Sequence, residues 1–526
     1  MNPSHTLALA LMTLAAPSLN AQAQPTMLET PSVAPQNAMT NSGADGRANS
    51  TYNLNFANAT HTSKTLTLGG QTIAFRAYEH IVYVQHPVDA KYERMNIYIP
   101  EAYFKGKSIG HFTAQTVPIF MPNAVGGYMP SEPDSPSVAR DGHSPNAAFI
   151  ALSKGYVVAT PGARGRTTQD THGQYTGKAP AAIVDLKAAV RYLRHNDAVM
   201  FGNAEKIISN GTSAGGALSA LLGASGNNTD YESELNALGA AKARDDVFAV
   251  SAYCPITNLD HADMAYEWQF NGVNAYQKMI MSKMIDFHAE RKTETGTLSA
   301  AQINTSNALQ ALFPAYLNSL KLTQTNGKPL NLDAQGNGSF KDLVKAYVIA
   351  SAQTALDSGT DLSPLPWVHL KGKKVTDIDY DGYIQANVRM KTPPAFDALD
   401  LSSGENDLFG TTSTQAQHFT AFGMGNSTAS GTQAAPATVN MMNAMHYLNH
   451  PNGIKKNGKN STTISKNWRI RHGTADRDTS LAIPVILATT LKNQGKNVDF
   501  SMPWNVPHSG DYDLDELFAW AEKVSR

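Results

Sequence analysis

The sequence predicts an α/β fold with a mainly parallel central sheet and a large inserted helical cap. Two observations predict it: apolar strand-like runs alternate with helical segments up to about residue 256, and the alternation returns after residue 390. Strands that alternate with helices pair in parallel, because each crossover connection is long enough to hold a helix. The pattern of the intervening residues 257–390 predicts mostly helices and loops, so we expect them to form a cap over the sheet.

The N-terminal residues predict an export signal followed by a linker. Residues 7–16 are apolar except for Thr13, and Ala21-Gln22-Ala23 has the small-residue pattern of a cleavage site. No Lys or Arg precedes the apolar run, so only the amino terminus supplies the positive charge of a signal. We expect residues 1–23 to direct export to the periplasm or the medium. Residues 24–50 are rich in Pro, Ala, Asn, Ser and Thr, which predicts a flexible linker.

The overall composition limits the kinds of partner that the protein is expected to bind. Lys and Arg total 42 against 43 Asp and Glu, so the charge favours neither nucleic acid nor an anionic membrane surface. No segment reaches the roughly 20 apolar residues that a membrane-spanning helix needs. The single cysteine, Cys254, excludes an internal disulfide, and its apolar neighbours predict a buried, inert thiol. We therefore expect a small-molecule partner.

Residues 51–256 form the first part of the predicted core. Residues 181–195 are predicted to be a helix, because their apolar residues recur at helical spacing. Short apolar runs predict the strands: two within residues 75–100, then 117–121, 156–160, 206–209 and 247–254.

Residues 257–390 form the predicted cap, and residues 391–526 complete the core. In the cap we predict helices at residues 300–313 and 340–356 and a loop at 359–367. In the second part of the core we predict strands at 392–397, 468–471 and 497–502, a helix at 481–491 and a polar stretch at 410–466.

The residues Gly211-Thr212-Ser213-Ala214-Gly215 follow the predicted strand at 206–209 and precede a helix start rich in small residues. This is the strand, turn and helix context of the GxSxG nucleophile elbow in α/β hydrolases. The glycines let the turn close without Cβ clashes, so that the Ser213 hydroxyl projects from the sheet. We predict that Ser213 is a nucleophile; the alternative is a serine in a glycine-rich turn.

A nucleophilic serine needs an acid and a base, and in α/β hydrolases the acid precedes the base along the chain. Asp476 lies in the polar loop after the strand at 468–471, and His508 lies in the loop after the strand at 497–502. This order predicts Asp476 as the triad acid and His508 as the base. A surface loop histidine is the alternative for His508, and His472 is the alternative base, although it precedes the acid.

Two backbone N–H groups are expected to form an oxyanion hole. The residue after the nucleophile, Ala214, supplies one of them. The second is expected in the glycine-rich loop after the strand at 117–121, at Gly127 or, as the alternative, Gly126. The sequence lacks the HGGG motif of many lipases, which argues against the hormone-sensitive lipase group.

The sequence gives no support for a metal or nucleotide cofactor. It contains no HExxH, no paired CxxC and no GxGxxG motif. Residues 453–460 are similar to a phosphate-binding loop, but they end in Asn where Ser or Thr would bind magnesium, and no strand precedes them.

The elbow and its helix, residues 211–223, resemble those of the bacterial tannases, α/β-hydrolase esterases that release gallate. The resemblance covers the chain from about residue 75 to the C-terminus, and Asp476 and His508 fall at the positions of the family's triad acid and base. Fungal tannases and related feruloyl esterases place cysteines beside the serine and histidine, which Cys254 alone cannot provide. The resemblance is therefore to the bacterial branch.

The resemblance also implies a binding site for the three hydroxyls of a galloyl ring. The family uses a lysine, a glutamate and an aspartate, whose counterparts are Lys391, Glu405 and Asp478. Charged partners in a partly dry pocket make strong hydrogen bonds to phenolic hydroxyls. The alternatives are that Lys391 and Glu405 are surface residues and that Asp478 supports its loop.

We therefore predict an exported serine esterase that hydrolyses galloyl ester and depside bonds without a cofactor. Two other kinds of enzyme would use the same triad and remain alternatives: a feruloyl or general carboxylesterase, and a peptidase of the prolyl oligopeptidase type. Only residues 51–74 precede the first predicted core strands, which leaves no room for that peptidase's propeller. The non-enzymatic alternative is a polyphenol-binding protein with the same fold. Covalent labelling of Ser213 by a fluorophosphonate would distinguish an enzyme from this binding protein.

Overall fold

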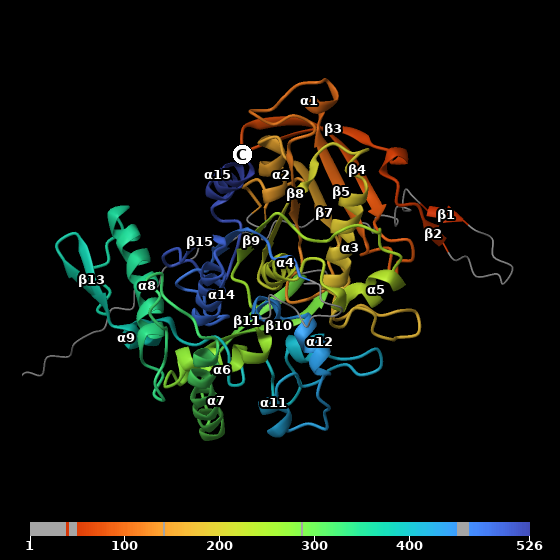
Figure 1. The fold of residues 1–526 in the computed structure, drawn as a ribbon. Coiled ribbons are helices and arrows are strands. Elements are labelled where there is room, and N and C mark those ends of the chain that lie inside the picture. Colours follow the sequence, from red (N-terminus) through yellow and green to blue (C-terminus); the bar gives the residue numbers. More distant parts are fainter. Residues whose placement is uncertain (1–37, 41–49, 140–141, 286–287, 450–461) are drawn as a thin grey trace, which may run out of the picture. The chain divides into compact units, whose positions relative to one another are not determined.

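The computed structural model describes residues 38–40, 50–139, 142–285, 288–449 and 462–526 (Figure 1). The predicted export signal at 1–23 and the loop at 453–460 lie outside the described residues. Within and beside the predicted linker, β1 (Ala38–Thr40) pairs antiparallel with β2 (Ser50–Tyr52).

In the described ranges, nine strands form one sheet. From the N-terminus they are β3 (Thr62–Leu68), β4 (Gln71–Val82), β5 (Arg94–Pro100), β6 (Pro118–Pro122), β7 (Val157–Pro161), β8 (Asn203–Thr212), β9 (Ala249–Tyr253), β14 (Asn467–Arg471) and β15 (Asn497–Ser501). Their order across the sheet is β15-β14-β9-β8-β6-β7-β5-β4-β3. The strands from β15 to β7 pair in parallel, whereas β5, β4 and β3 join antiparallel. The predicted α/β fold with a mainly parallel sheet is confirmed.

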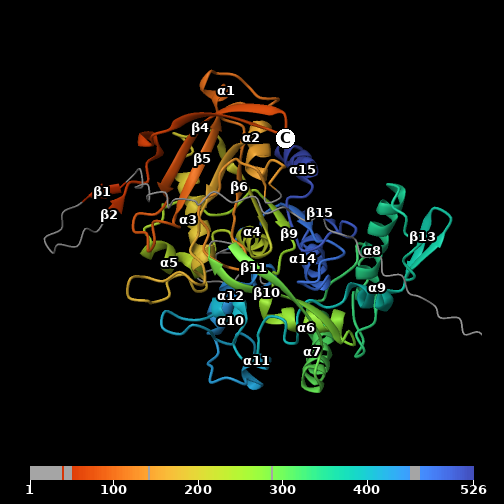
Figure 2. The same ribbon diagram turned by 180° about the vertical axis from the view of Figure 1, so that it is seen from behind.

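The middle strands are buried along their whole length because both faces of the sheet are covered. Every residue of β5, β7, β9 and β14 is buried. The helices that accompany these strands are α2 (Ala147–Ser153), α3 (Ala181–His195), α4 (Ala214–Ala224), α14 (Ala482–Asn493) and α15 (Leu514–Ser525) (Figures 1 and 2). Shorter helical turns are α1 (Glu101–Phe104), α5 (Glu232–Ala237), η1 (Phe56–Asn58) and η2 (Thr229–Tyr231). Helix α3 spans the residues that its periodicity predicts.

Residues 254–466 are inserted between β9 and β14, which are neighbours in the sheet. The first part of this insertion contains α6 (Leu259–Phe270), β10 (Ala275–Ile285), β11 (His288–Thr297), α7 (Ala300–Ser319), α8 (Ser339–Asp357), β12 (Val368–Lys371), β13 (Lys374–Ile378) and α9 (Tyr380–Asn387). Its second part contains α10 (Gly404–Leu408), α11 (Ala421–Gly425), α12 (Pro436–Met441) and α13 (Ala444–Asn449). Helices α7 and α8 confirm the helices predicted at residues 300–313 and 340–356.

Two antiparallel hairpins in the insertion, β10–β11 and β12–β13, were not predicted. Figures 1 and 2 show α8, α9 and β13 grouped beside β15 and α14. The rings of Tyr347 on α8 and Phe500 on β15 have centroids 4.8 Å apart, and Lys492 on α14 donates a hydrogen bond to the Tyr347 hydroxyl. The insertion therefore contacts the edge strand of the sheet directly.

The strand predicted at residues 392–397 does not form, and this prediction is wrong. Pro393 and Pro394 have no N–H to donate to a neighbouring strand. The backbone amides of Phe396 and Asp397 donate to the two carboxylate oxygens of Asp263 on α6 at 2.7 and 3.0 Å. A buried carboxylate thus replaces the sheet as the acceptor for this segment.

None of the helices in the described ranges combines the length and the apolar character that crossing a bilayer requires.

Helix α4 packs very closely on the sheet at Gly223. A Cβ added there would lie 2.3 Å from Val250 Cγ2 and 2.9 Å from an atom of the Trp468 ring, and both side chains are fully buried. Because Ser213 immediately precedes α4, this close packing helps to fix the position of the turn that holds the serine.

We predict that Gly223→Ala lowers the free energy of unfolding by about 1–3 kcal/mol, because the added methyl group overpacks the core. The midpoint of urea unfolding, followed by circular dichroism, measures the effect. Gly425→Ala in α11 is the matched control, since a Cβ there meets nothing within 4 Å. Equal midpoints for the two variants would contradict the prediction.

Candidate active site

Ser213 occupies the sharp turn between β8 and α4, with φ 60° and ψ −124°. Such a backbone conformation costs a non-glycine residue roughly 1–3 kcal/mol, so the surrounding structure must hold it in place. The Ser213 amide donates a hydrogen bond to the Tyr253 carbonyl at 3.0 Å. A Cβ at Gly211 would lie 2.3 Å from the Gly215 carbonyl oxygen, so only glycine permits this turn.

Four neighbouring parallel strands, β8, β9, β14 and β15, end at the same edge of the sheet. Their pairing places the last residues of the four strands in one row: Thr212, Tyr253, Arg471 and Ser501. Ser213 follows the first of these strands, Asp476 the third and His508 the fourth. The carboxyl edge of a parallel sheet is where loops from separate strands converge, which brings the three side chains together.

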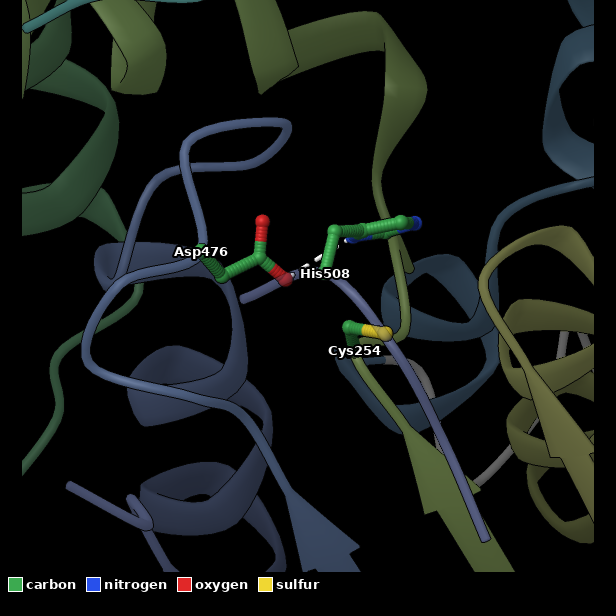
Figure 3. A group of neighbouring side chains, drawn as sticks. All are labelled: Cys254, Asp476 and His508. Atoms are coloured by element: carbon green, nitrogen blue, oxygen red, sulfur yellow. Dashed lines mark hydrogen bonds and ion pairs between the residues drawn. The ribbon is translucent and has the colours of Figure 1, made fainter. Parts of the chain in front are cut away.

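The imidazole of His508 bridges Ser213 and Asp476. Its Nε2 lies 2.9 Å from Ser213 Oγ, and its Nδ1 lies 2.8 Å from Asp476 Oδ2. Figure 3 shows the carboxylate of Asp476 directed at the His508 ring. With the proton on Nδ1 donated to Asp476, Nε2 is free to accept the serine proton.

The loops that carry Asp476 and His508 are hydrogen-bonded to each other. Thr474 N–H donates to the Pro503 carbonyl at 2.9 Å, and Ala475 N–H donates to the Val506 carbonyl at 3.1 Å. A Cβ at Gly473 would lie 1.9 Å from the Val506 carbonyl oxygen, so this approach requires glycine. These contacts fix the separation between the acid and the base.

The charges around His508 favour its protonated form. Burial disfavours the imidazolium, but the carboxylates of Asp476 and Asp478 outweigh burial and hold the pKa of His508 well above its usual value. Burial likewise opposes ionisation of Asp476, yet His508 and His472 outweigh it and the pKa of Asp476 lies below its usual value. The Asp476 carboxylate is therefore well placed to stabilise the imidazolium that forms when His508 accepts a proton.

His472, the alternative base, is fully buried, and its Nδ1 lies 3.7 Å from Asp476 Oδ2. Burial lowers the pKa of His472. The serine hydroxyl contacts His508, and His472 lies against the acid instead.

Cys254 follows β9 and lies beside the His508 imidazole (Figure 3). It is 1% exposed, its Sγ lies 3.3 Å from the Ser509 carbonyl oxygen, and burial raises the pKa of its thiol. Cys254, Asp476 and His508 present three potential metal-ligand atoms within 4.8 Å of one another. Both nitrogens of His508 already have partners in Ser213 and Asp476, so a metal ion would have to displace one of them.

The loop after β6, which contains the predicted oxyanion donor Gly127, packs against the elbow. Asn123 Nδ2 donates to the carbonyls of Asn210 and Gly215, both at 3.1 Å, and a Cβ at Gly215 would lie 2.8 Å from the Val125 carbonyl oxygen. Gly127 is exposed and has φ 55°.

Ala214 is the first residue of α4, where backbone N–H groups have no partner inside the helix. Among the described residues, neither the Ala214 amide nor the Gly127 amide has an acceptor. Both amides are therefore candidate donors to an oxyanion.

The three charged residues expected to bind the galloyl ring interact electrostatically near His508. Lys391 Nζ lies 3.1 Å from Asp478 Oδ1 and 3.9 Å from the centroid of the Phe396 ring. Asp478 Oδ2 is 4.0 Å from His508 Nε2. Burial raises the pKa of Glu405, while Lys391 opposes and Asp478 reinforces this shift. Lys391 and Asp478 are each about one-fifth exposed, so a ligand can reach them.

Arg166 is a site residue that the sequence analysis missed. Its Nε donates to the Gly127 carbonyl at 2.9 Å, and its guanidinium forms an ion pair with Asp407 on α10, the helix that carries Glu405. Lys178 forms a second ion pair with Asp407. One sequence feature could have pointed to Arg166: it lies in the loop that follows β7, another parallel strand of the sheet.

Comparisons with known proteins identify relatives over most of the chain. The BD-FAE family model matches residues 137–307, and no curated protein sequence matches. The tannase of Fusobacterium nucleatum is 51% identical with a TM-score of 0.84, and the match covers 90% of this chain and 100% of that one.

A tannase from Lactobacillus plantarum is 46% identical with a TM-score of 0.85, over 90% of this chain and 100% of that one. A tannin acyl hydrolase in complex with ethyl gallate is 47% identical with a TM-score of 0.83, over 90% of this chain and 99% of that one. Identity at this level over nearly the whole of both chains goes beyond a shared fold. The chain belongs to the tannase family.

Proposed function

We propose that this chain is a serine esterase that hydrolyses galloyl ester and depside bonds and releases gallate. The observation that carries the proposal is the His508 imidazole, which lies within hydrogen-bond distance of Ser213 and Asp476 and 4.0 Å from Asp478. The similar tannin acyl hydrolase in complex with ethyl gallate supports the substrate class.

In the first half of the reaction, Ser213 Oγ attacks the ester carbonyl carbon while its proton passes to His508 Nε2. Asp476 accepts the Nδ1–H hydrogen bond and stabilises the imidazolium. The carbonyl oxygen becomes an oxyanion, for which the amides of Ala214 and Gly127 are the proposed donors. When the intermediate collapses, the ester C–O bond breaks, and His508 gives its proton to the departing alcohol oxygen.

In the second half, water attacks the acyl-enzyme carbonyl carbon and gives a proton to His508 Nε2. Collapse of this second intermediate breaks the bond to Ser213 Oγ, which takes the proton back. Gallate leaves as the acid product, and the resting triad is restored. No cofactor takes part in this sequence of steps.

Lys391, Glu405 and Asp478 are the proposed partners of the ring hydroxyls. The ammonium can donate to a phenolic oxygen, and the carboxylates can accept from phenolic O–H groups. An ester without these hydroxyls cannot form these hydrogen bonds, yet its bound ring would still displace water from around the three charged groups, which penalises its binding. This difference separates the proposal from a feruloyl or general carboxylesterase.

We predict that methyl gallate is hydrolysed with a kcat/KM about a hundredfold above those of methyl ferulate and p-nitrophenyl acetate. Ser213→Ala is expected to lower the rate by roughly 10⁴-fold or more, because the nucleophile is lost. Initial rates for the three esters measure both effects. Equal activity on all three would overturn the galloyl site but retain Ser213, and no activity on any would favour the polyphenol-binding alternative.

We predict that Asp478→Asn moves the acid limb of the pH profile to lower pH. The His508 pKa is held above its usual value partly by the Asp478 carboxylate, so a neutral amide destabilises the imidazolium and lowers that pKa. The profile of kcat/KM for p-nitrophenyl acetate, an ester without ring hydroxyls to bind, reports this shift in the free enzyme. Asp515→Asn, at a carboxylate that is 96% exposed, is the matched control and is expected to leave the limb in place. An unchanged or upward shift in Asp478→Asn would refute the assignment.

We also propose export to the periplasm or the medium, on the basis of the apolar run at residues 7–16 and the Ala21-Gln22-Ala23 motif. Fractionation of the producing cells, with N-terminal sequencing of the recovered protein, tests this. The expected first residue is Gln24. A chain that stays in the cytoplasm with Thr13 still present would contradict the proposal.

A further inference from the structure

We propose that a cavity behind the loops of Asp476 and His508 is a second binding site, which takes a neutral phenolic ring. The inference rests on the proposed function in one respect: the ring is expected to be a remote galloyl group of a large ester. The cavity has a volume of about 340 Å³, within the range of small-molecule sites. Neither the triad nor Lys391, Glu405 or Asp478 lines it.

The cavity lies between the insertion and the core. The insertion contributes six residues between Thr360 and Trp367 and two side chains of α9, and the core contributes Thr474, Ala475, Trp504 and Asn505. Ala475 immediately precedes Asp476, and Trp504 is four residues before His508. The two loops that carry the acid and the base are therefore also a wall of this cavity.

Aromatic side chains from both sides line the cavity. The rings of Trp367 in the insertion and Trp504 in the core have centroids 5.7 Å apart and an interplanar angle of 36°. Tyr383 on α9 contributes a third ring, with its centroid 5.1 Å from that of Trp367. Both tryptophans are only partly buried, so part of their surface remains open to a ligand. Such a wall favours a planar aromatic ligand, which can stack or meet it edge to face.

Polar groups at the same cavity match phenolic hydroxyls. The Asp361 carboxylate and the Asn505 amide are both exposed at its rim, and Asn387 lies beside Thr474, to whose carbonyl it donates at 3.3 Å. These groups include acceptors for phenolic O–H groups and amide donors for phenolic oxygens.

The charge of the lining selects a neutral ring over a carboxylate. Asp361 is acidic, and none of the lining residues, all of which the structure describes, is Lys, Arg or His. Gallate, the anionic product, would meet a carboxylate without a cationic partner. A galloyl group that is still esterified carries no such charge, so we infer the ester form as the occupant.

Hydrogen bonds to Thr474 hold together the wall between this cavity and the triad. Tyr383 donates its hydroxyl proton to the Thr474 carbonyl, and Asn505 N–H donates to Thr474 Oγ1 at 2.7 Å. Thr474 therefore connects the insertion to both catalytic loops. An aromatic group in the cavity contacts these loops without entering the galloyl site at Lys391.

The kinetic test compares a polygalloyl glucose with methyl gallate. Trp367→Ala and Trp504→Ala are expected to raise KM for the large ester about five- to tenfold and to change KM for methyl gallate less than twofold. The conservative variants Trp367→Phe and Trp504→Phe keep an aromatic face and are expected to restore most of the affinity. Trp367 lies outside the catalytic loops, so its variant remains informative if Trp504→Ala does not fold.

A binding test separates this proposal from the proposed function, because it needs no turnover. Calorimetric titration of Ser213→Ala with pyrogallol, a neutral trihydroxybenzene, is expected to show two sites, of which Trp367→Ala removes one. Lys391→Met is expected to remove the other. If KM rises only for the large ester, the ring in the cavity belongs to the bound substrate. If pyrogallol binds at two sites but KM does not change, the cavity binds a separate phenolic molecule. Both outcomes support a binding site in the cavity. One-site binding, together with equal KM changes for the large and small esters, would overturn it.

Discussion

The hydrogen bond between His508 and Ser213 is the contact on which the rest of the site depends. It joins residues 295 positions apart in the sequence, and it can form only because β8 and β15 end at the same edge of the sheet. The register across β8, β9, β14 and β15 aligns their last residues in one row, so the loops that follow these strands all begin at the same edge of the sheet. Close packing at Gly223 and Gly473 then removes the remaining freedom between helix, strands and loops. The strained backbone of Ser213 is held by this surrounding structure.

The insertion and the sheet contribute differently to the site. Ser213, Asp476 and His508 follow strands of the sheet, whereas Lys391 and Glu405 lie in the segment between β9 and β14. Arg166 links the two groups, because it holds the Gly127 carbonyl on one side and Asp407 of α10 on the other. A displacement of α10 would therefore be transmitted to the loop of the proposed oxyanion donor. The proposed ring-binding residues and the proposed oxyanion donor therefore share this structural support.

Much of the core was predictable because its signals are local. The helix over residues 181–195 and the strands around the elbow follow from apolar periodicity in continuous, buried segments. The hairpin β10–β11 was missed because residues 288–297, which pair with β10, are largely polar and lack the alternation of a half-buried strand. The apparent strand at 392–397 failed for a nonlocal reason, since Asp263, more than 100 positions away, accepts its free amides. Local pattern reveals strand propensity but not the partner that satisfies a backbone amide.

The same distinction explains what the sequence revealed of the site. Chain order was sufficient to expect Ser213, Asp476 and His508 after the ends of three separate strands, because a parallel sheet converts sequence order into proximity at one edge. Arg166 and Asp407 are 241 positions apart, and no order rule relates a loop of the core to a helix of the insertion. The cavity lined by Trp367 and Trp504 is equally nonlocal, since its two tryptophans come from opposite sides of the interface between insertion and core. The residues proposed for the chemistry are thus recognisable from the order of the strands. The order of the strands does not reveal the proposed ring-binding residues of the insertion, which were expected only from the family resemblance, because their position depends on how the insertion packs on the core.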